Sequence, residues 1–518
     1  MRLLDTMAGR KSEADEGSES SLTTVVSGGT LIFAGRVVGL GLGFLTQVVL
    51  ARLLTQEAYG EVVLTLAVLN TVGTIAQLGL DDGAMRQFPQ FEDDAGKARG
   101  VARAAIGIAI VSGSVAGIGV FVFAPVIATL VFDNMSLVSL IRIAAIGVPF
   151  VAIGAVSVGL ARGARDARTR TYVDHLAKPI LRLGFVAVLL LGGFGTVGAV
   201  AGEVGAYVLS GILGLVLVLR VLPSLGQPFV PMYRTVLMFS LPLIAVQALN
   251  TFVTQIDIYV LGYFWSSSTV GVYNIALQLS NLFFPILFSF SFLLPPILTR
   301  LHKQGKTNEM RRTYQSLTKW IVVLGTPLLL LMVFAPKLVI AVLFGADYTR
   351  GATALRILAI GNFFAISTGL TNASLIGLGE NQLVALLVFY QTGVNAVLDL
   401  LLIPAYVTTG AALATALAVA TNNAIGVVLL YQRFGVHPVK RATFVSVAVV
   451  GAIATVAFGV VSAVGLPPSF VVPIVGVLYP FVVLRVAVEP EDEELLVLLE
   501  SRTNTDLTAV RRAVRAVK

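Results

Sequence analysis

The chain has 518 residues, of which 56% are hydrophobic and only 12% are charged, about half the charged share of a typical soluble domain. Together with a mean hydropathy of +0.89, this composition excludes a soluble globular protein and predicts a polytopic membrane protein. The absence of cysteine excludes a disulfide framework and any thiolate metal site or nucleophile, and the scattered histidines argue against a histidine metal site.

The predicted elements are helices that cross the membrane. Residues 1–21 are polar and acidic, so we expect a disordered cytoplasmic tail. Apolar stretches of about 20 residues, enough to cross a bilayer, then predict an all-α integral membrane fold with fourteen transmembrane helices. We divide these into a first lobe of six spans (22–222), a linker (223–232), a second lobe of six spans (233–434) and two further spans (435–488), followed by a cytoplasmic amphipathic tail (489–518).

The distribution of lysine and arginine predicts the orientation. Most of these residues fall in the tails and in the loops on the side of the N-terminus, whereas Arg52, Lys337 and Arg350 fall on the other side. The positive-inside rule therefore predicts a multi-pass protein of the cell membrane with both termini in the cytoplasm. Because the net charge of +8 reflects this bias, nucleic acid is not an expected partner.

Small and polar residues follow helical spacing in the first lobe. Gly35, Gly39 and Gly43 lie four apart and predict a ridge on which another helix packs closely. Polar side chains are unfavourable against lipid, so a polar face should line a cavity. Such faces contain Arg36 and Gln47 in the first span, Asn70, Thr74, Gln77 and Asp81 in the second, and Asp174, Lys178 and Arg182 in the fifth.

The two lobes repeat one plan. Phe123-Ala124-Pro125 recurs 211 residues later as Phe334-Ala335-Pro336, and the same offset aligns Gly60 with Gly271 and Asn70 with Asn281. Six spans per copy is an even number, so both copies have the same topology. This predicts a parallel repeat about a pseudo-two-fold axis along the membrane normal.

The second lobe carries polar residues of a different character. A stripe on the seventh span is expected on one face of a single cavity-lining helix, and consists of Ser240, Gln247, Asn250, Thr254 and Asp257. The eighth and eleventh spans add Asn274, Gln278 and Asn281, and Gln391, Asn395 and Asp399. The charges at membrane depth are thus mainly acidic in this lobe and mainly basic in the first.

Several strings resemble the polysaccharide-transport branch of the multidrug/oligosaccharidyl-lipid/polysaccharide exporter superfamily. They are Gly35-Arg36 running to Leu50-Ala51-Arg52, Tyr59-Gly60, Leu78-Gly79-Leu80 with Gly83 and Arg86, and Phe344-Gly345 with Tyr348. The resemblance implies a flippase, not an enzyme, that moves an oligosaccharide linked to a polyprenyl or dolichyl phosphate or diphosphate from the inner to the outer leaflet by alternating access. It implies membrane lipids as partners and leaves open glycosyltransferases of the same pathway.

The deep cations are the predicted ligands of such a headgroup. Each Lys or Arg at mid-membrane costs about 2.5 to 3.5 kcal/mol, so Arg36, Lys178 and Arg182 facing lipid would together cost on the order of 8 to 10 kcal/mol. We therefore expect them in an aqueous cavity, with Asp174 nearby, where they bind phosphate or acidic sugars. The alternative is that Lys178 snorkels to the interface and Asp174 balances its charge. The full predicted substrate set is Arg36, Gln47, Asn70, Gln77, Asp174, Lys178, Arg182, Gln247, Asn250, Asn274, Gln278 and Asn281.

A coupling cation is predicted in the second lobe. The pattern resembles the sodium site of lipid II flippases, which implies Asp257, Asn395, Asp399 and Thr415 as ligands here. Sodium or protons are the alternatives, and no other cofactor is expected. The opposing interpretation is that both carboxyl groups stay protonated and serve the structure. Other functions left open are a cation-coupled multidrug exporter of the same superfamily and a membrane-embedded glycosyltransferase or polymerase.

Overall fold

The computed structural model describes residues 35–222, 227–291, 294–464, and 471, 473, 476, 478 and 479. All of its regular elements are helices, as the sequence predicts. The predicted tails 1–21 and 489–518 lie outside the described residues, as does most of the predicted fourteenth span.

The first group of helices follows the predicted first lobe. Its members are Gly35–Leu53, α2 (Gln56–Ala76), α3 (Leu80–Gln87), α4 (Ala95–Val126), α5 (Leu137–Gly163), α6 (Ala167–Arg170), α7 (Lys178–Leu191) and α8 (Gly195–Val221). Short turns of other helix types complete it, namely η1 (Phe88–Phe91), η2 (Ile127–Val131) and η3 (Thr171–Ala177). We call α2 to α8 the first bundle.

The remaining helices form a second group and two connections to it. The second bundle comprises α11 (Ser267–Ser280), α12 (Phe283–Ser291), α13 (Leu294–Lys303), α14 (Thr307–Phe334), α15 (Pro336–Leu343), η4 (Ala346–Gly351), α16 (Ala352–Ser367), α17 (Thr371–Gly377) and α18 (Asn381–Phe434). The helices α9 (Tyr233–Thr254) and α10 (Ile256–Phe264) join the bundles, and α19 (Arg441–Ala463) packs on α14.

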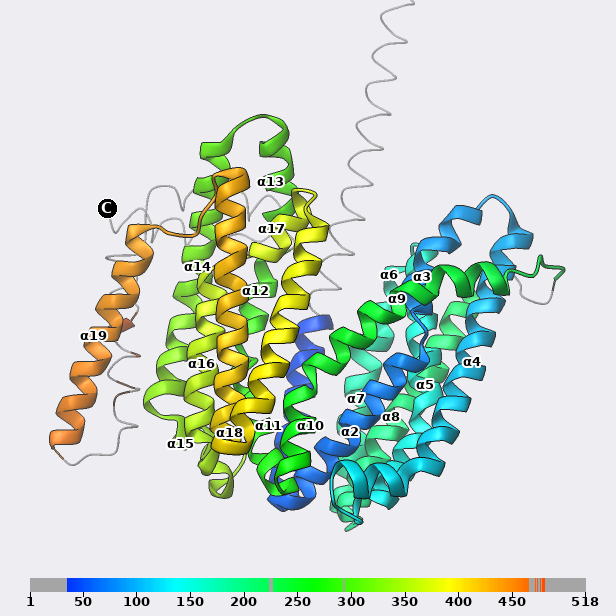
Figure 1. Cartoon of the computed structure of the whole chain (residues 1–518), viewed down its shortest axis with the longest axis horizontal. Helices are drawn as coiled ribbons and strands as arrows, with labels where there is room; N and C mark the ends of the chain where they lie inside the picture. Colours follow the sequence, from blue (N-terminus) through cyan, green and yellow to red (C-terminus); the bar gives the residue numbers. More distant parts are fainter. Residues whose placement is uncertain are drawn as a thin grey trace, which may run out of the picture.

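The two bundles meet at one end and diverge at the other (Figure 1). The elements α6 and α13 lie at the divergent end, and α15 lies at the joined end, beside the junction of α2 with α11. The predicted lobe boundaries themselves stay predictions.

Nine helices of the described residues are long and apolar enough to cross a membrane. The predicted number of fourteen therefore stays a prediction. One of the nine, α18, has 54 residues and would be about 80 Å long if straight, whereas the bilayer core is roughly 30 Å thick. Its backbone leaves the helical region at Val407 (φ 54°, ψ −129°), and Figure 1 shows two antiparallel segments, as the predicted eleventh and twelfth spans require.

The seventh predicted span is not a single helix, which corrects the sequence-based expectation. Its first part, α9, ends at Thr254, and α10 begins at Ile256 after a residue with φ −119° and ψ −2°. The packing changes at this break, because α9 contacts mainly α2, α3 and α4, whereas α10 contacts mainly α18 and α11 of the second bundle. Each helix also makes fewer contacts with the other bundle, α9 with α18 and α10 with α2.

The segment before α9 is fixed to the first bundle. The Arg99 side chain donates hydrogen bonds to the Pro228 carbonyl oxygen (2.9 Å) and to Gln227 Oε1 (3.1 Å). The Val230 amide donates to the Gly96 carbonyl oxygen (3.1 Å). The last residues of the predicted linker therefore extend the first bundle.

The helix Gly35–Leu53 likewise contacts both bundles. A Cβ added to Gly39 would lie 2.6 Å from the carbonyl oxygen of His175 in the first bundle, so the predicted small-residue ridge does allow close packing there, whereas Gly43 has open space around it. At its other end the helix turns toward the second bundle, where Phe44 meets the ring of Phe344 edge-on at 5.7 Å.

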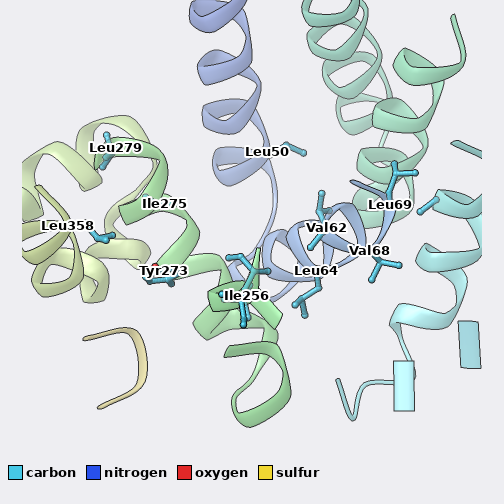
Figure 2. Packing of buried hydrophobic residues seen from close by; sticks show 14 of the residues in the cluster. Leu50, Val62, Leu64, Val68, Leu69, Ile256, Tyr273, Ile275, Leu279 and Leu358 are labelled. Atoms are coloured by element: carbon cyan, nitrogen blue, oxygen red, sulfur yellow. The ribbon is translucent and has the colours of Figure 1, made fainter. Parts of the chain in front are cut away.

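The bundles touch most closely where α2 crosses α11. A Cβ added to Gly60 would lie 1.7 Å from the carbonyl oxygen of Ser267, and one added to Gly271 would lie 2.7 Å from that of Gln56. These are the two glycines that the repeat aligns, so equivalent positions of the two copies face each other. Figure 2 shows the buried apolar side chains of the first helix, α2, α10, α11 and α16 around this contact, which we call the junction.

Hydrogen bonds to backbone oxygens reinforce the junction. Arg52 Nε donates to the carbonyl oxygen of Leu343 (3.0 Å), and its Nη2 to those of Ala341 (3.2 Å) and Val342. These carbonyls end α15, where a positive charge is favourable. Thus a cation from the first repeat binds a helix end of the second.

Candidate functional site: a polar cavity and a buried carboxylate cluster

A cavity of about 240 Å³ lies within the first bundle. Small residues of α5, including Gly154, Ala155 and Gly159, leave the space, and polar side chains from six elements surround it. The polar lining consists of Gln77, Asp81, Arg162, Arg170, Asp174, Lys178, Tyr207 and Ser210. The lining carries three cations and two carboxylates, and Arg162 Nη1 lies 3.8 Å from Oδ1 of a further carboxylate, that of Asp82.

The local backbone that presents Asp174 and Lys178 is a π-helical turn. The Lys178 amide donates to the carbonyl oxygen of Val173, five residues earlier. Pro179 has no amide hydrogen for the next bond and its ring disfavours a regular helix before it, which accounts for the wider turn. Both predicted residues line the cavity.

Lys178 is further held by an aromatic ring. Its Nζ lies 4.2 Å from the ring centroid of Tyr207, whose hydroxyl donates to Asn70 Oδ1 (2.8 Å). Asn70 thus acts behind the cavity wall by orienting Tyr207, and Gln77 lines the cavity itself.

The other predicted cations are elsewhere. Arg182 Nε lies 2.6 Å from Glu203 Oε1, with the Arg182 side chain 24% exposed and that of Glu203 1% exposed. The guanidinium of Arg36 lies 4.3 Å from the ring centroid of Phe288 on α12. Neither Arg36 nor Arg182 is among the cavity-lining residues, so the structure does not bring the three predicted cations together.

The stripe on α9 packs against the first bundle. Gln247 Nε2 donates to both carboxylate oxygens of Asp81 (2.9 and 3.1 Å), and the buried Ser240 fits against Gly83, where an added Cβ would lie 2.0 Å from its Oγ. Gln247 therefore reaches the cavity rim through Asp81. The Thr254 hydroxyl donates to its own helix at Thr251, and the side chain of Asn250 lies outside the described part of the chain.

A buried carboxylate cluster lies where α10 packs on the second bundle, built from α10, α11 and α18. The hydroxyl of Tyr273 donates to Asp257 Oδ2 (2.7 Å) and lies 3.4 Å from Thr415 Oγ1. Asp257 Oδ1 accepts the Ile258 amide (2.9 Å). Asp257 and Asp399 are close enough for their charges to interact.

Asp399 differs from Asp257 in having no partner. Its side chain is fully buried, and among the described residues neither of its carboxylate oxygens, nor the Nδ2 of Asn395, has a hydrogen-bond partner. A buried polar group without a partner is expensive. Two carboxylates with hydroxyl and amide oxygens suit a hard cation of low charge or a proton. No group of three or more acidic, His or Cys residues that could hold a metal occurs in the described ranges.

Two residues predicted to bind substrate, Gln47 and Asn274, lie at the junction and not on the cavity lining. The buried hydroxyl of Tyr59 lies 2.8 Å from Gln47 Oε1 and 2.8 Å from Asn274 Oδ1, which joins the first helix, α2 and α11. Gln278 is half-buried on α11, and Asn281 caps that helix through its backbone.

A family model described as polysaccharide biosynthesis protein matches residues 49–352, more than half of the chain. The chain belongs to this family. The resemblance to the polysaccharide-transport branch of the exporter superfamily, drawn from sequence strings, is thereby confirmed, and the protein is a multi-pass membrane protein.

Solved structures share the fold of this family member. Lipid II flippase MurJ in an inward closed conformation is 14% identical, with a TM-score of 0.69 over 89% of this chain and 100% of that chain. An inward-facing multidrug resistance transporter of the MATE family is 17% identical, with a TM-score of 0.59 over 78% and 98%. At these identities the likeness concerns the fold alone.

Two uncharacterized membrane proteins of Methanocaldococcus jannaschii are sequence relatives. One is 24% identical over 39% of this chain and 41% of its own length, and the other 26% identical over 49% and 62%. The matches thus span less than two thirds of either relative.

Sequence reasoning missed several residues of these sites. Arg162 and Arg170 line the cavity, yet they precede the fifth span and were counted only as inner-side charges. Glu203 pairs with Arg182 of α7, a helix other than its own, and the local sequence of α8 does not indicate this partner. The best available signal was the presence of tyrosines within apolar spans, since a buried Tyr hydroxyl usually finds a hydrogen-bond partner.

Proposed function

We propose that this family member is a flippase that moves a lipid-linked oligosaccharide across the membrane, with the cavity of the first bundle as the site for the anionic part of the headgroup. The supporting observation is a polar lining inside a membrane helix bundle, where the three cations Lys178, Arg162 and Arg170 surround one space. At about 240 Å³ it is smaller than the roughly 300–1,000 Å³ of sites for drug-sized ligands, so it suits a phosphate or one acidic sugar rather than the whole oligosaccharide.

The arrangement of the bundles supports alternating access. Basic residues are concentrated at the divergent end, in the segments around α6 and α13. The positive-inside rule supports placing this end in the cytoplasm and the junction at the outer side. The headgroup enters between the divergent ends, and opening of the junction releases it to the outer leaflet, with the lipid tail remaining among membrane lipids. Glycosyltransferases of the same pathway are the expected source of this substrate.

The test is transport in vesicles of defined composition. Purified protein is reconstituted with a polyprenyl-diphosphate oligosaccharide, and transfer between leaflets is scored by accessibility of the sugar to an added enzyme. We expect Lys178→Gln to reduce transfer by about tenfold or more, as for loss of a charge-assisted contact of about 1.5–3 kcal/mol. The matched control is Lys337→Gln, an exposed lysine on α15. Equal transfer by both variants would refute the assignment of the cavity.

The second part of the proposal is cation coupling at Asp257, Asn395, Asp399 and Thr415. It is supported by the unpartnered carboxylate of Asp399 and the oxygen-rich surroundings of Asp257. Transfer should increase with a sodium gradient, or with a proton gradient if protons are the coupling ion, and Asp399→Asn should remove the response. Indifference of the unmodified protein to both gradients would leave a passive flippase.

A multidrug exporter is the second candidate, since the MATE transporter shares the fold. The same vesicles decide between the two functions when they are loaded with a lipophilic cationic drug. The three cations on the lining should disfavour such a drug, so we expect no drug transport.

A further inference from the structure

Two consecutive buried residues of α11, Tyr273 and Asn274, contact two different clusters. Tyr273 donates to Asp257 in the carboxylate cluster (2.7 Å), and Asn274 accepts from Tyr59 at the junction (2.8 Å). Consecutive residues of an α-helix point about 100° apart, so one helix can contact both clusters within one turn. Tyr59 and Tyr273 are both fully buried, so neither hydroxyl can exchange its partner for bulk water.

We propose that Tyr273 is a positioning residue that transmits cation binding at the carboxylate cluster to the junction through Asn274. This inference rests on the proposed cation coupling. With Tyr273 hydrogen-bonded to Asp257, the junction is closed. A cation bound by Asp257 competes with the Tyr273 hydroxyl for Oδ2, and the ring displaced from this oxygen shifts together with α11.

A movement of α11 is not absorbed locally, because its contact with α2 is tight. The backbones of Gly60 and Gly271 leave no space for even a Cβ between the two helices. Close-packed interiors transmit small shifts instead of deforming continuously. The Tyr59 hydroxyl has one hydrogen and two acceptor oxygens at 2.8 Å, on Gln47 and Asn274, so withdrawal of Asn274 removes one of its two partners across the junction. Cation binding therefore favours the open junction.

The experiment measures the separation of the divergent ends. Because the chain has no cysteine, spin labels at Asp93→Cys and Gln304→Cys, exposed positions before α4 and α14, report the distance between the two bundles without background labelling. Pulsed electron paramagnetic resonance gives the populations of long and short distances in sodium chloride and in choline chloride. Calorimetry gives the sodium affinity of the same proteins.

We expect sodium to shift the populations of the unmodified sequence by a factor typical of allosteric coupling, about 5- to 150-fold. Tyr273→Phe should lose this shift and bind sodium more tightly, because the cation no longer competes with the hydroxyl or opens the junction. The control is Tyr314→Phe, which removes another fully buried hydroxyl of the second bundle, bonded to Thr368, and should respond like the unmodified sequence.

The outcomes separate the two proposals. If Tyr273→Phe shows the normal sodium-dependent shift, the inference is wrong while cation coupling stands. If the unmodified sequence binds no sodium and shows no shift with sodium or with pH, cation coupling is wrong and the inference falls with it. If Tyr273→Phe does not fold, Asn274→Leu serves instead, since it leaves the carboxylates in place. It should raise the open population in choline chloride and weaken the response to sodium, and a normal response would contradict the inference.

Discussion

The ion pair between Arg182 and Glu203 gives a prediction that separates a structural role from a substrate-binding role. Glu203→Gln keeps the shape of the side chain but leaves Arg182 without its partner at 2.6 Å. Removing one partner of a buried pair costs about 3–5 kcal/mol. Because the Arg182 side chain is still 24% exposed, we expect Glu203→Gln to lower the free energy of unfolding by about 3 kcal/mol, the lower end of this range.

The double variant Arg182→Gln/Glu203→Gln should be much more stable than the sum of the single effects implies. It removes both charges, and replacing a whole buried pair is often close to neutral. Unfolding of the purified protein in detergent can be followed by the fluorescence of its two tryptophans. Additive effects of the two single variants would refute the pairing.

Transport by the double variant then decides the role of Arg182. If the pair is structural, the folded double variant transports lipid-linked oligosaccharide at close to the normal rate, which is the result we expect. A stable double variant without transport would instead support the sequence-based prediction that Arg182 binds the headgroup.

Two backbone features give further predictions. Gly60→Ala places a Cβ 1.7 Å from a carbonyl oxygen and should destabilise the protein by about 1–3 kcal/mol or more. The control Gly41→Ala, whose added Cβ would have nothing within 4 Å, should be neutral or slightly stabilising. Equal thermal unfolding of both variants would contradict the tight junction. Pro179→Ala restores an amide hydrogen and should convert the π-turn to α-helix, which changes the position of Lys178 relative to Asp174. We expect weaker substrate affinity in the vesicle assay at unchanged stability. An unchanged affinity would show that the turn does not matter for binding.

Helical spacing predicted those contacts that depend on one helix at a time. Asp174 and Lys178, four apart, line one cavity together with Gln77. The repeat offset aligned Gly60 with Gly271, which face each other at the junction. Periodicity and repeats indicate which face of a helix carries polar or small residues, and that face is the same in the folded protein.

Contacts between helices distant in sequence were not predictable in the same way. Arg182 is predicted to lie in a water-filled environment because its own helix offers no counter-charge beside it, but Glu203 supplies one from α8. Likewise, the stripe from Ser240 to Asp257 was continued through Gln255 because nothing in the local sequence marks a break. The break coincides with a change in packing, since α9 lies mainly on the first bundle and α10 mainly on the second, a tertiary effect that local pattern does not report.

The helix Gly35–Leu53 and α9 both carry contacts between the two halves of the sequence. Phe44 of the first helix packs on Phe344 of the second bundle, and the segment before α9 is hydrogen-bonded to Arg99 of α4. Each half produced alone would therefore carry one helix with an uncovered surface and lack another that should cover its own. A substitution on either side of these contacts is constrained by residues that the other half supplies.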